Sequence, residues 1–97
     1  FGNFDMGEEM GWYDIYQGTE ELMPFAHAVS AKSHNFDAEG NERDKDYMRL
    51  MRIVLDAGYR GWVGVEYEGS EVGEYDGITL TKNLLERCLV ELTPEYI

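Results

Sequence analysis

Apolar residues recur at helical spacing in three parts of the chain. The first helix is predicted over residues 13–23 and ends at Pro24, because proline cannot continue a helix without losing a hydrogen bond. The second begins after Asp44 or Asp46, either of which can cap it, and stops at Gly58. The residues expected to face the core are Ile15, Leu22 and Met23 in the first helix and Tyr47, Leu50, Met51, Val54 and Leu55 in the second.

The third predicted helix covers about residues 77–91. Thr93 and Pro94 are expected to end it. Cys88 lies among leucines, which predicts a buried structural thiol, and it is the one cysteine of the chain, so no intrachain disulfide can form. The residues expected to point inward are Ile78, Leu84, Leu85, Cys88 and Leu92.

Two segments rich in β-branched and aromatic residues predict strands, over residues 27–32 and about 61–68. Successive side chains of a strand point to opposite faces, so Val29 and Ala31 share one face of the first strand. We expect Trp62, at the start of the second strand, to belong to the core. In that strand Trp62, Gly64, Glu66 and Glu68 point one way and Val63, Val65 and Tyr67 the other.

The alternation of strands and helices predicts an α/β fold with a parallel sheet and right-handed crossovers. Strands with one aliphatic face and one face of small or functional residues are typical of a β/α barrel, with helices outside and a narrow lumen inside. A complete (β/α)₈ TIM barrel needs roughly 250 residues. We therefore predict that residues 1–97 are the C-terminal part of a single TIM-barrel domain, from about the end of strand six, at residues 1–5, to helix eight.

The formal net charge of −12 over 97 residues argues against DNA, RNA and anionic membranes, which bind Lys and Arg. Most of this charge is interpreted as a solvated acidic surface, although a cation site is compatible with it. No run of 18 apolar residues exists, so no membrane span is predicted. No secretory signal is visible, which predicts a cytoplasmic protein; the chain starts at Phe1 rather than Met, so a natural N-terminus with a signal would be missing.

Polar side chains gather where the predicted strands end. Glu66 and Glu68 lie at the carboxyl end of the second complete strand, Lys32 and His34 at that of the strand before it, and Asn3 at that of the partial strand. Catalytic groups of β/α barrels occupy these positions. Adjacent parallel strands lie about 4.8 Å apart, so Lys32 and Glu66 are expected to meet. A partly desolvated carboxylate needs a cation, either Lys32 or a metal, to remain ionised.

These residues also have structural interpretations. Glu66 can be a structural ion pair with Lys32, and His34 can be an ordinary solvated loop histidine. The glycine-rich loop at 69–77 precedes a helix, where phosphates often bind, but its acidic residues would repel a dianion and no GK[ST] motif is present. An uncharged sugar or polyol is therefore the predicted ligand.

Three segments resemble the sugar phosphate isomerase/epimerase family of the xylose-isomerase-like TIM-barrel superfamily. They read GNFD, VSAKSHNFDAEGNERDKDYMRLMRIVLDAGYRGWVGVEYEG and EYDGITLTKNLLER, and together they cover about residues 1–90. The most specific part is DAGYRGWVGVEYEG, in which a helix, a turn and a final strand ending in glutamate recur as a block. These segments identify the superfamily well and the substrate poorly.

The resemblance implies one divalent metal (Mn²⁺, Mg²⁺, Co²⁺ or Zn²⁺) bound by two Glu, one Asp and one His. Glu66 matches the final-strand glutamate, which implies that it is both a metal ligand and the acid/base that moves the proton beside the carbonyl. Ser30 stands where the family's histidine ligand is expected, so the metal site is altered, weaker or lost. The residues expected to bind substrate are Asn3, Lys32, His34 and Glu68.

Two kinds of function follow from these observations. The first is a sugar isomerase or epimerase that acts on a ketose or polyol by metal-assisted proton transfer next to a carbonyl. The second is a non-catalytic sugar-binding relative, or a dehydratase or lyase on the same barrel, with the metal site altered at Ser30. The predicted partner in each case is a small-molecule sugar or polyol, and a homo-oligomer is an assembly that the sequence allows.

Overall fold

The computed structural model describes residues 1 and 14–96. In this part of the chain, three α-helices and a two-stranded parallel sheet follow one another in the order α1, β1, α2, β2, α3, with a short 3₁₀ turn, η1, after α1. The elements are α1 (Ile15–Leu22), η1 (Met23–Phe25), β1 (Val29–Ser33), α2 (Tyr47–Asp56), β2 (Val63–Tyr67) and α3 (Glu74–Tyr96).

The first two helices begin at carboxylate caps. The Asp14 side chain accepts hydrogen bonds from two backbone N–H groups in the first turn of α1, at 2.8 and 3.1 Å. Asp46, one of the two predicted caps, accepts a backbone N–H of α2 at 3.1 Å. Such caps satisfy donors that the first turn leaves without a partner. The predicted ends are confirmed as well, because Pro24 lies in η1 and Gly58 adopts the left-handed φ of +91° just after α2.

α3 is longer than predicted at both ends. It starts at Glu74 and runs to Tyr96, so Pro94 lies in the last turn instead of ending the helix. Proline removes one N–H and crowds the carbonyl four residues earlier, and at this position only the final turn is affected. Ile78 is 44% exposed rather than buried, whereas the predicted inward residues Leu84, Cys88 and Leu92 are buried. Although α3 has 23 residues, no helix within residues 14–96 is long and apolar enough to cross a membrane.

β1 and β2 pair in parallel, as predicted, and the register places Lys32 opposite Glu66. The predicted alternation in β1 is confirmed, because Val29 and Ala31 are buried and Ser30 is exposed. The expectation that Trp62 belongs to the core is wrong, since its side chain is 94% exposed. Trp62 precedes the first residue of β2, and at this place the described residues leave its side chain almost uncovered.

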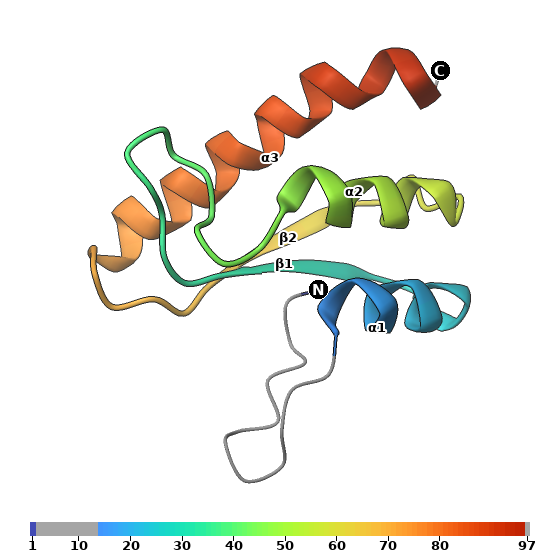
Figure 1. Cartoon of the computed structure of the whole chain (residues 1–97), viewed down its shortest axis with the longest axis horizontal. Coiled ribbons are helices and arrows are strands. Elements are labelled where there is room, and N and C mark those ends of the chain that lie inside the picture. The colour runs from blue at the N-terminus through green and yellow to red at the C-terminus, as the bar shows by residue number, and fades with distance from the viewer. Residues whose placement is uncertain (2–13, 97) are drawn as a thin grey trace, which may run out of the picture.

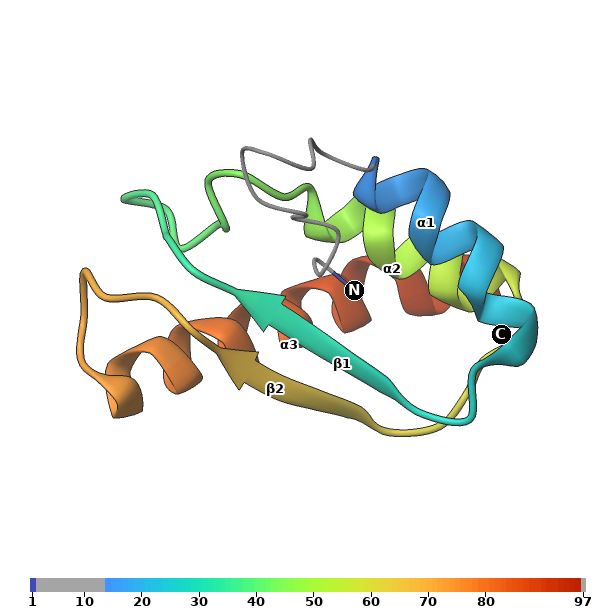
Figure 2. The ribbon, with the colours of Figure 1, turned by 90° about the horizontal axis from the view of Figure 1, so that it is seen from below.

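The core lies between one face of the sheet and the helices. Figures 1 and 2 show α2 and α3 on one side of the two strands, with α1 next to α2. One cluster of buried residues joins β1, α2 and α3, and a smaller one joins η1, β1 and α2. The members of the first are Ala31, Tyr47, Leu50, Leu84, Cys88 and Leu92, and those of the second are Met23, Val29 and Val54.

The prediction of a C-terminal part of a TIM barrel is wrong. The described residues form a small α/β domain with three helices and a two-stranded parallel sheet. The strand pattern misled because small and polar residues on the second face of a strand suit a solvated sheet face as well as a barrel lumen. In this fold that face, which carries Ser30, Lys32, Gly64 and Glu66, is the one that α2 and α3 leave uncovered (Figure 2).

Phe1 lies at the edge of β1 that does not face β2. The N–H of Lys32 donates to the Phe1 carbonyl at 3.3 Å, and the Phe1 nitrogen donates to the carbonyl of Ser30 at 2.6 Å. The remainder of the predicted partial strand at residues 1–5, including Asn3, lies outside the described residues. The proposed role of Asn3 in substrate binding therefore stays a prediction.

Candidate functional site

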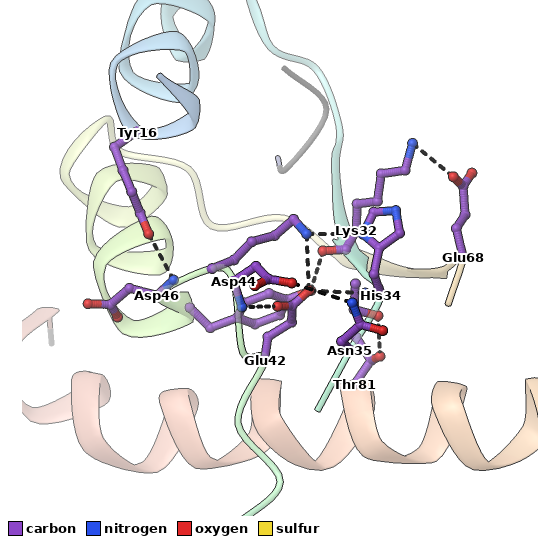
Figure 3. A network of polar contacts seen from close by, with 12 residues as sticks. Tyr16, Lys32, His34, Asn35, Glu42, Asp44, Asp46, Glu68 and Thr81 are labelled. Carbon is purple, nitrogen blue, oxygen red and sulfur yellow. Dashed lines mark hydrogen bonds and ion pairs between the residues drawn. The ribbon is translucent and has the colours of Figure 1, made fainter. Parts of the chain in front are cut away.

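Lys32, Glu66 and Glu68 form a polar group at the carboxyl ends of the two strands, here called the strand-end cluster. Lys32 Nζ lies 3.0 Å from Glu68 Oε2 and 4.0 Å from Glu66 Oε2. The predicted meeting of Lys32 and Glu66 is confirmed, but the nearer carboxylate is that of Glu68 (Figure 3). The hydrogen bond from Lys32 lowers the pKa of Glu68, so the Glu68 carboxylate is charged at neutral pH.

Glu66 borders a hollow of about 410 Å³ whose other lining residues come mainly from α1, η1 and the start of β1. Ser30 and Thr19 contribute further polar groups to its lining, and the apolar part comes from residues such as Met23 and Phe25. Small-molecule sites typically measure about 300–1,000 Å³ and combine apolar walls with a few polar groups. The Glu66 side chain is 39% exposed, so its carboxylate is accessible to a molecule in this hollow.

Buried hydroxyl groups fix the backbone behind the strand-end cluster. The Tyr47 hydroxyl donates to the carbonyl of Lys32 at 2.7 Å, and burial raises the pKa of Tyr47, which keeps the hydroxyl protonated. The hydroxyls of Ser33 and Thr81 lie 2.6 Å apart and join β1 to α3. The N–H of Glu68 donates to the Ser33 carbonyl at 2.8 Å, which extends the pairing of the strands beyond β2.

The loop after β1 folds back on itself in a tight turn. The Asp37 carboxylate accepts two backbone N–H groups across the turn, both at 2.9 Å. Gly40 has a φ of +83°, a left-handed conformation that glycine adopts without steric cost. An isolated antiparallel bridge pairs Phe36 with Glu42. The turn thereby returns Glu42 to the start of the loop, next to His34.

A buried network connects Glu42, His34 and Lys45 (Figure 3). The Glu42 side chain is fully buried, and its Oε2 accepts the backbone N–H of His34 and a hydrogen bond from Lys45 Nζ, both at 3.0 Å. Its Oε1 accepts the N–H of Asp44 at 2.7 Å. Lys45 Nζ also lies 3.0 Å from Nδ1 of His34. The sequence predicted only a polar loop here, because a Glu–Lys pair three residues apart is too common to indicate a buried network.

The loops that follow β1 and β2 are held together beside the strand-end cluster. Arg43 and Glu71 form an ion pair between them, and Arg87 of α3 donates to a carbonyl of the first loop at 2.7 Å. Gly69 passes so close to the carbonyl of His34 that a Cβ at this position would clash with it. The absence of a side chain at Gly69 therefore lets the second loop approach His34.

The structure brings together some of the predicted site residues and separates others. His34 follows Lys32 by two residues and contacts Lys45 and Glu42, whereas Lys32 pairs with Glu68 (Figure 3). Ser30, which occupies the position expected for a histidine ligand, is exposed on the open face of β1. At strand spacing His34 is carried about 13 Å further along the chain, so it does not replace Ser30.

The described residues do not by themselves provide a divalent metal site. No group of three or more His, Cys, Asp or Glu side chains suited to hold a metal ion occurs within residues 14–96. Glu66 and Glu68 have Lys32 between them, and an ammonium group at this place repels a second cation. Glu66 as a metal ligand, and the metal itself, therefore stay predictions that require ligands outside the described residues.

A second hollow, of about 620 Å³, lies between α2, β2 and α3. Its walls are mostly apolar and include the exposed side chains of Trp62 and Leu89. None of the three residues of the strand-end cluster lines it. Glu66 of the strand-end cluster borders the smaller hollow instead.

Comparison with known proteins links the chain to a carbohydrate-acting enzyme. No protein-family model matches it. The chain is a weak homologue of a C-glycoside deglycosidase alpha subunit from Arthrobacter globiformis, with 36% identity over 77 residues, which is 73% of this chain. The chain spans 22% of the length of that relative. The homology is consistent with a sugar-related activity, and it does not single out the xylose-isomerase-like superfamily.

Proposed function

We propose that the chain contributes to an enzyme that converts a sugar or polyol, with Glu66 moving a proton next to a carbonyl group. The observation that carries this proposal is the position of the Glu66 carboxylate, which is 39% exposed and borders a hollow of about 410 Å³. The homology to a C-glycoside deglycosidase alpha subunit supports a carbohydrate as the ligand.

The ion pair between Lys32 and Glu68 leaves Glu66 suited to act as a base. Lys32 Nζ is 1.0 Å nearer to Glu68 than to Glu66, from the two separations of 3.0 and 4.0 Å, so its hydrogen bond goes to Glu68. The Glu66 carboxylate can then accept a proton from the carbon next to the carbonyl of a bound ketose, while the C–H electron pair moves toward the carbonyl oxygen and gives an enediolate. The positive charge of Lys32 stabilises that developing negative charge.

Return of the proton distinguishes the proposed reactions. Delivery to the neighbouring carbon, together with passage of the hydroxyl proton to the former carbonyl oxygen, completes an isomerisation. Delivery to the opposite face of the same carbon completes an epimerisation. Loss of a leaving group from the enediolate instead gives an elimination, the reaction of a dehydratase or lyase. The name of the homologous deglycosidase subunit favours bond cleavage as the second candidate.

The proposed partner is a small neutral sugar or polyol. The chain's formal charge of −12 supports this choice over nucleic acids and anionic membranes, as well as over a phosphorylated sugar. A divalent metal, if ligands outside the described residues complete its site, would polarise the carbonyl. A non-catalytic sugar-binding role and a homo-oligomer remain alternatives that the same experiment addresses.

Hydrogen exchange provides the test. The natural protein, at its natural length, is incubated in D₂O with D-fructose, D-tagatose and D-xylulose in turn. NMR measures the exchange of the proton next to the carbonyl of each ketose. We expect exchange with at least one ketose, and Glu66→Gln is expected to slow it about 100-fold or more, the usual contribution of a general base. Glu86→Gln is the matched control, because it removes the same charge from the partner of an exposed lysine, Lys82, outside the strand-end cluster.

The outcomes separate the alternatives. A Glu66→Gln protein that exchanges the proton at the wild-type rate contradicts the proposal. Binding of a ketose without exchange or elimination products supports the non-catalytic role. Elimination products that disappear with Glu66→Gln identify the lyase reaction. Size-exclusion chromatography with light scattering on the same samples determines whether the protein forms a homo-oligomer.

A further inference from the structure

We propose that Glu42 and Lys45 position His34 as a hydrogen-bond donor to the ligand of the strand-end cluster, by fixing its neutral tautomer with the proton on Nε2. The donor role rests on the proposed function, because it requires a ligand at this place. The tautomer follows from the geometry of the buried network alone.

Glu42 is the anchor of this network. Its side chain is fully buried, and its two oxygens accept hydrogen bonds from the N–H of His34, the N–H of Asp44 and Lys45 Nζ. A carboxylate with three donors, one of them an ammonium group, is compensated for the loss of water. The turn that starts at Asp37 holds Glu42 in place, so the anchor is part of the fold of the loop.

Lys45 determines the tautomer of His34. Its side chain is only 10% exposed, and its ammonium nitrogen lies 3.0 Å from both Glu42 Oε2 and His34 Nδ1. An ammonium group has three donors and no acceptor. The Nδ1 atom must therefore accept, which leaves the ring proton on Nε2. A proton on Nδ1 of His34 would instead point at an N–H of the Lys45 ammonium group, and two donors would face each other.

His34 is placed so that this Nε2–H can donate to a ligand bound at the strand-end cluster. Its Nδ1 faces the ammonium of Lys45, and His34 follows Lys32 by two residues, so strand alternation turns the two side chains toward the same face where β1 ends. Among the described residues no hydrogen bond to His34 Nε2 is found. The side chain is partly exposed, and the site then combines two donors, Lys32 and His34, with the acceptors Glu66 and Glu68.

The consequence is a preference for ligand oxygens that accept hydrogen bonds. A histidine free to exchange tautomers can donate or accept at Nε2, whereas one held by Lys45 can only donate. A site built to bond a particular substrate group rejects analogues that lack it, because its own polar group is then left without a partner. Lys45 and Glu42 are positioning residues in this account, since neither is proposed to touch the ligand.

Nitrogen NMR tests the tautomer directly. The protein is labelled with ¹⁵N-histidine, and the multiple-bond spectrum at pH 7 reports the protonation of Nδ1 and Nε2 in each ring. His34→Gln assigns the signals, and the exposed His27 is the internal control. We expect His34 to be almost entirely the Nε2–H form, and Lys45→Met to give a mixture of tautomers like that of His27. A wild-type His34 that carries its proton on Nδ1 overturns the inference.

A second variant keeps the test interpretable if Lys45→Met misfolds. Lys45→Met leaves the buried Glu42 carboxylate without its cation and can destabilise the loop. The double variant Glu42→Gln/Lys45→Met removes both charges and keeps an acceptor for the N–H of His34. It is expected to fold and to lose the fixed tautomer, and a pure Nε2–H form in this variant contradicts the role of Lys45.

Ligand binding then separates this inference from the proposed function. D-fructose, D-tagatose and D-xylulose are titrated into the labelled protein while the Nε2 signal of His34 is recorded. We expect a saturable shift with at least one ketose and about twofold weaker binding by the double variant, because only the Nε2–H fraction of an equal tautomer mixture can donate. Equal affinity of the two proteins overturns the positioning role and leaves the proposed function standing. A fixed tautomer with no ketose binding to either protein overturns the donor role and the proposed function, and the tautomer assignment stands.

Discussion

Lys32 is bonded to Glu68, two residues beyond the Glu66 that faces it in the parallel register. The separations from Lys32 Nζ are 3.0 Å to Glu68 Oε2 and 4.0 Å to Glu66 Oε2, although Glu66 is the residue paired with Lys32 across the strands. The side chain of Lys32 therefore reaches past its register partner toward the start of the loop that follows β2 (Figure 3).

Removal of Lys32 is expected to raise the pKa of Glu68. The hydrogen bond from Lys32 is the main cause that holds this pKa below the ordinary value of 4.5. In Lys32→Met the pKa should return to or above that value, and carbon NMR of the carboxyl groups measures it. Because the native pKa is lowered, the ion pair stabilises the fold above pH 4.5 and its contribution disappears as the pH falls through the lowered native value.

A matched control for this measurement is Lys82→Met. Lys82 pairs with Glu86 at 2.9 Å on α3, in an exposed pair of the same chemistry. This change should leave the titration of Glu68 as it is in the wild type. A Glu68 carboxyl that titrates identically in Lys32→Met and in the wild type would show that the ion pair is not formed in solution.

Truncation of Trp62 is expected to have little effect on stability. The side chain is 94% exposed, and surface substitutions usually change the free energy of unfolding by less than about 0.5 kcal/mol. Leu50→Ala is the comparison, because Leu50 is fully buried and such truncations cost about 2–5 kcal/mol. Urea denaturation followed by circular dichroism measures both. A cost for Trp62→Ala near that of Leu50→Ala would indicate that Trp62 is covered in solution.

Gly77→Ala is expected to destabilise the fold although it lies inside α3. Alanine favours a helix by about 1 kcal/mol over glycine, but a Cβ here would meet the ring of Tyr67, and overpacking costs about 1–3 kcal/mol. The matched change Gly64→Ala adds a methyl group whose nearest neighbour, Ser30 Oγ, is 3.7 Å away, an ordinary contact. Thermal unfolding should give a lower midpoint for Gly77→Ala than for Gly64→Ala, and the reverse order contradicts the packing of Tyr67 on α3.

The buried thiol of Cys88 is expected to make stability depend on pH in the alkaline range. Burial raises its pKa from 9.0 to about 11, so the folded state holds the proton more tightly than the unfolded state does. The stabilisation is complete below pH 9.0 and is lost as the pH rises to about 11, with a total change of about 3 kcal/mol at most.

Cys88→Ala isolates this contribution. The alanine variant lacks the thiol, so its free energy of unfolding should fall less steeply between pH 9.0 and about 11 than that of the wild type. Urea denaturation at several pH values gives the two curves. Parallel curves would mean that the thiol titrates equally in the folded and unfolded states.

Much of the local structure was predictable from the sequence. Asp46 caps α2, Pro24 and Gly58 end helices, and the alternation of Val29, Ser30 and Ala31 fixes the faces of β1. These features depend on neighbouring residues and on backbone geometry, which the order of residue types encodes directly. The parallel pairing and the approach of Lys32 to Glu66 also follow, because strands joined by a helix run side by side in the same direction.

Only the tertiary structure decided the number of strands, the exposure of Trp62 and the partner of Lys32. A polar strand face is compatible with a barrel lumen and with solvent, and the described fold leaves it open. The buried link from Glu42 through Lys45 to His34 depends on a turn that brings residues 34 and 42 together, and no periodicity reports such a contact. The sequence by itself determined the helices, the strands and the residues at their ends, because those are set by local spacing; the neighbours of each side chain were determined by how these elements pack.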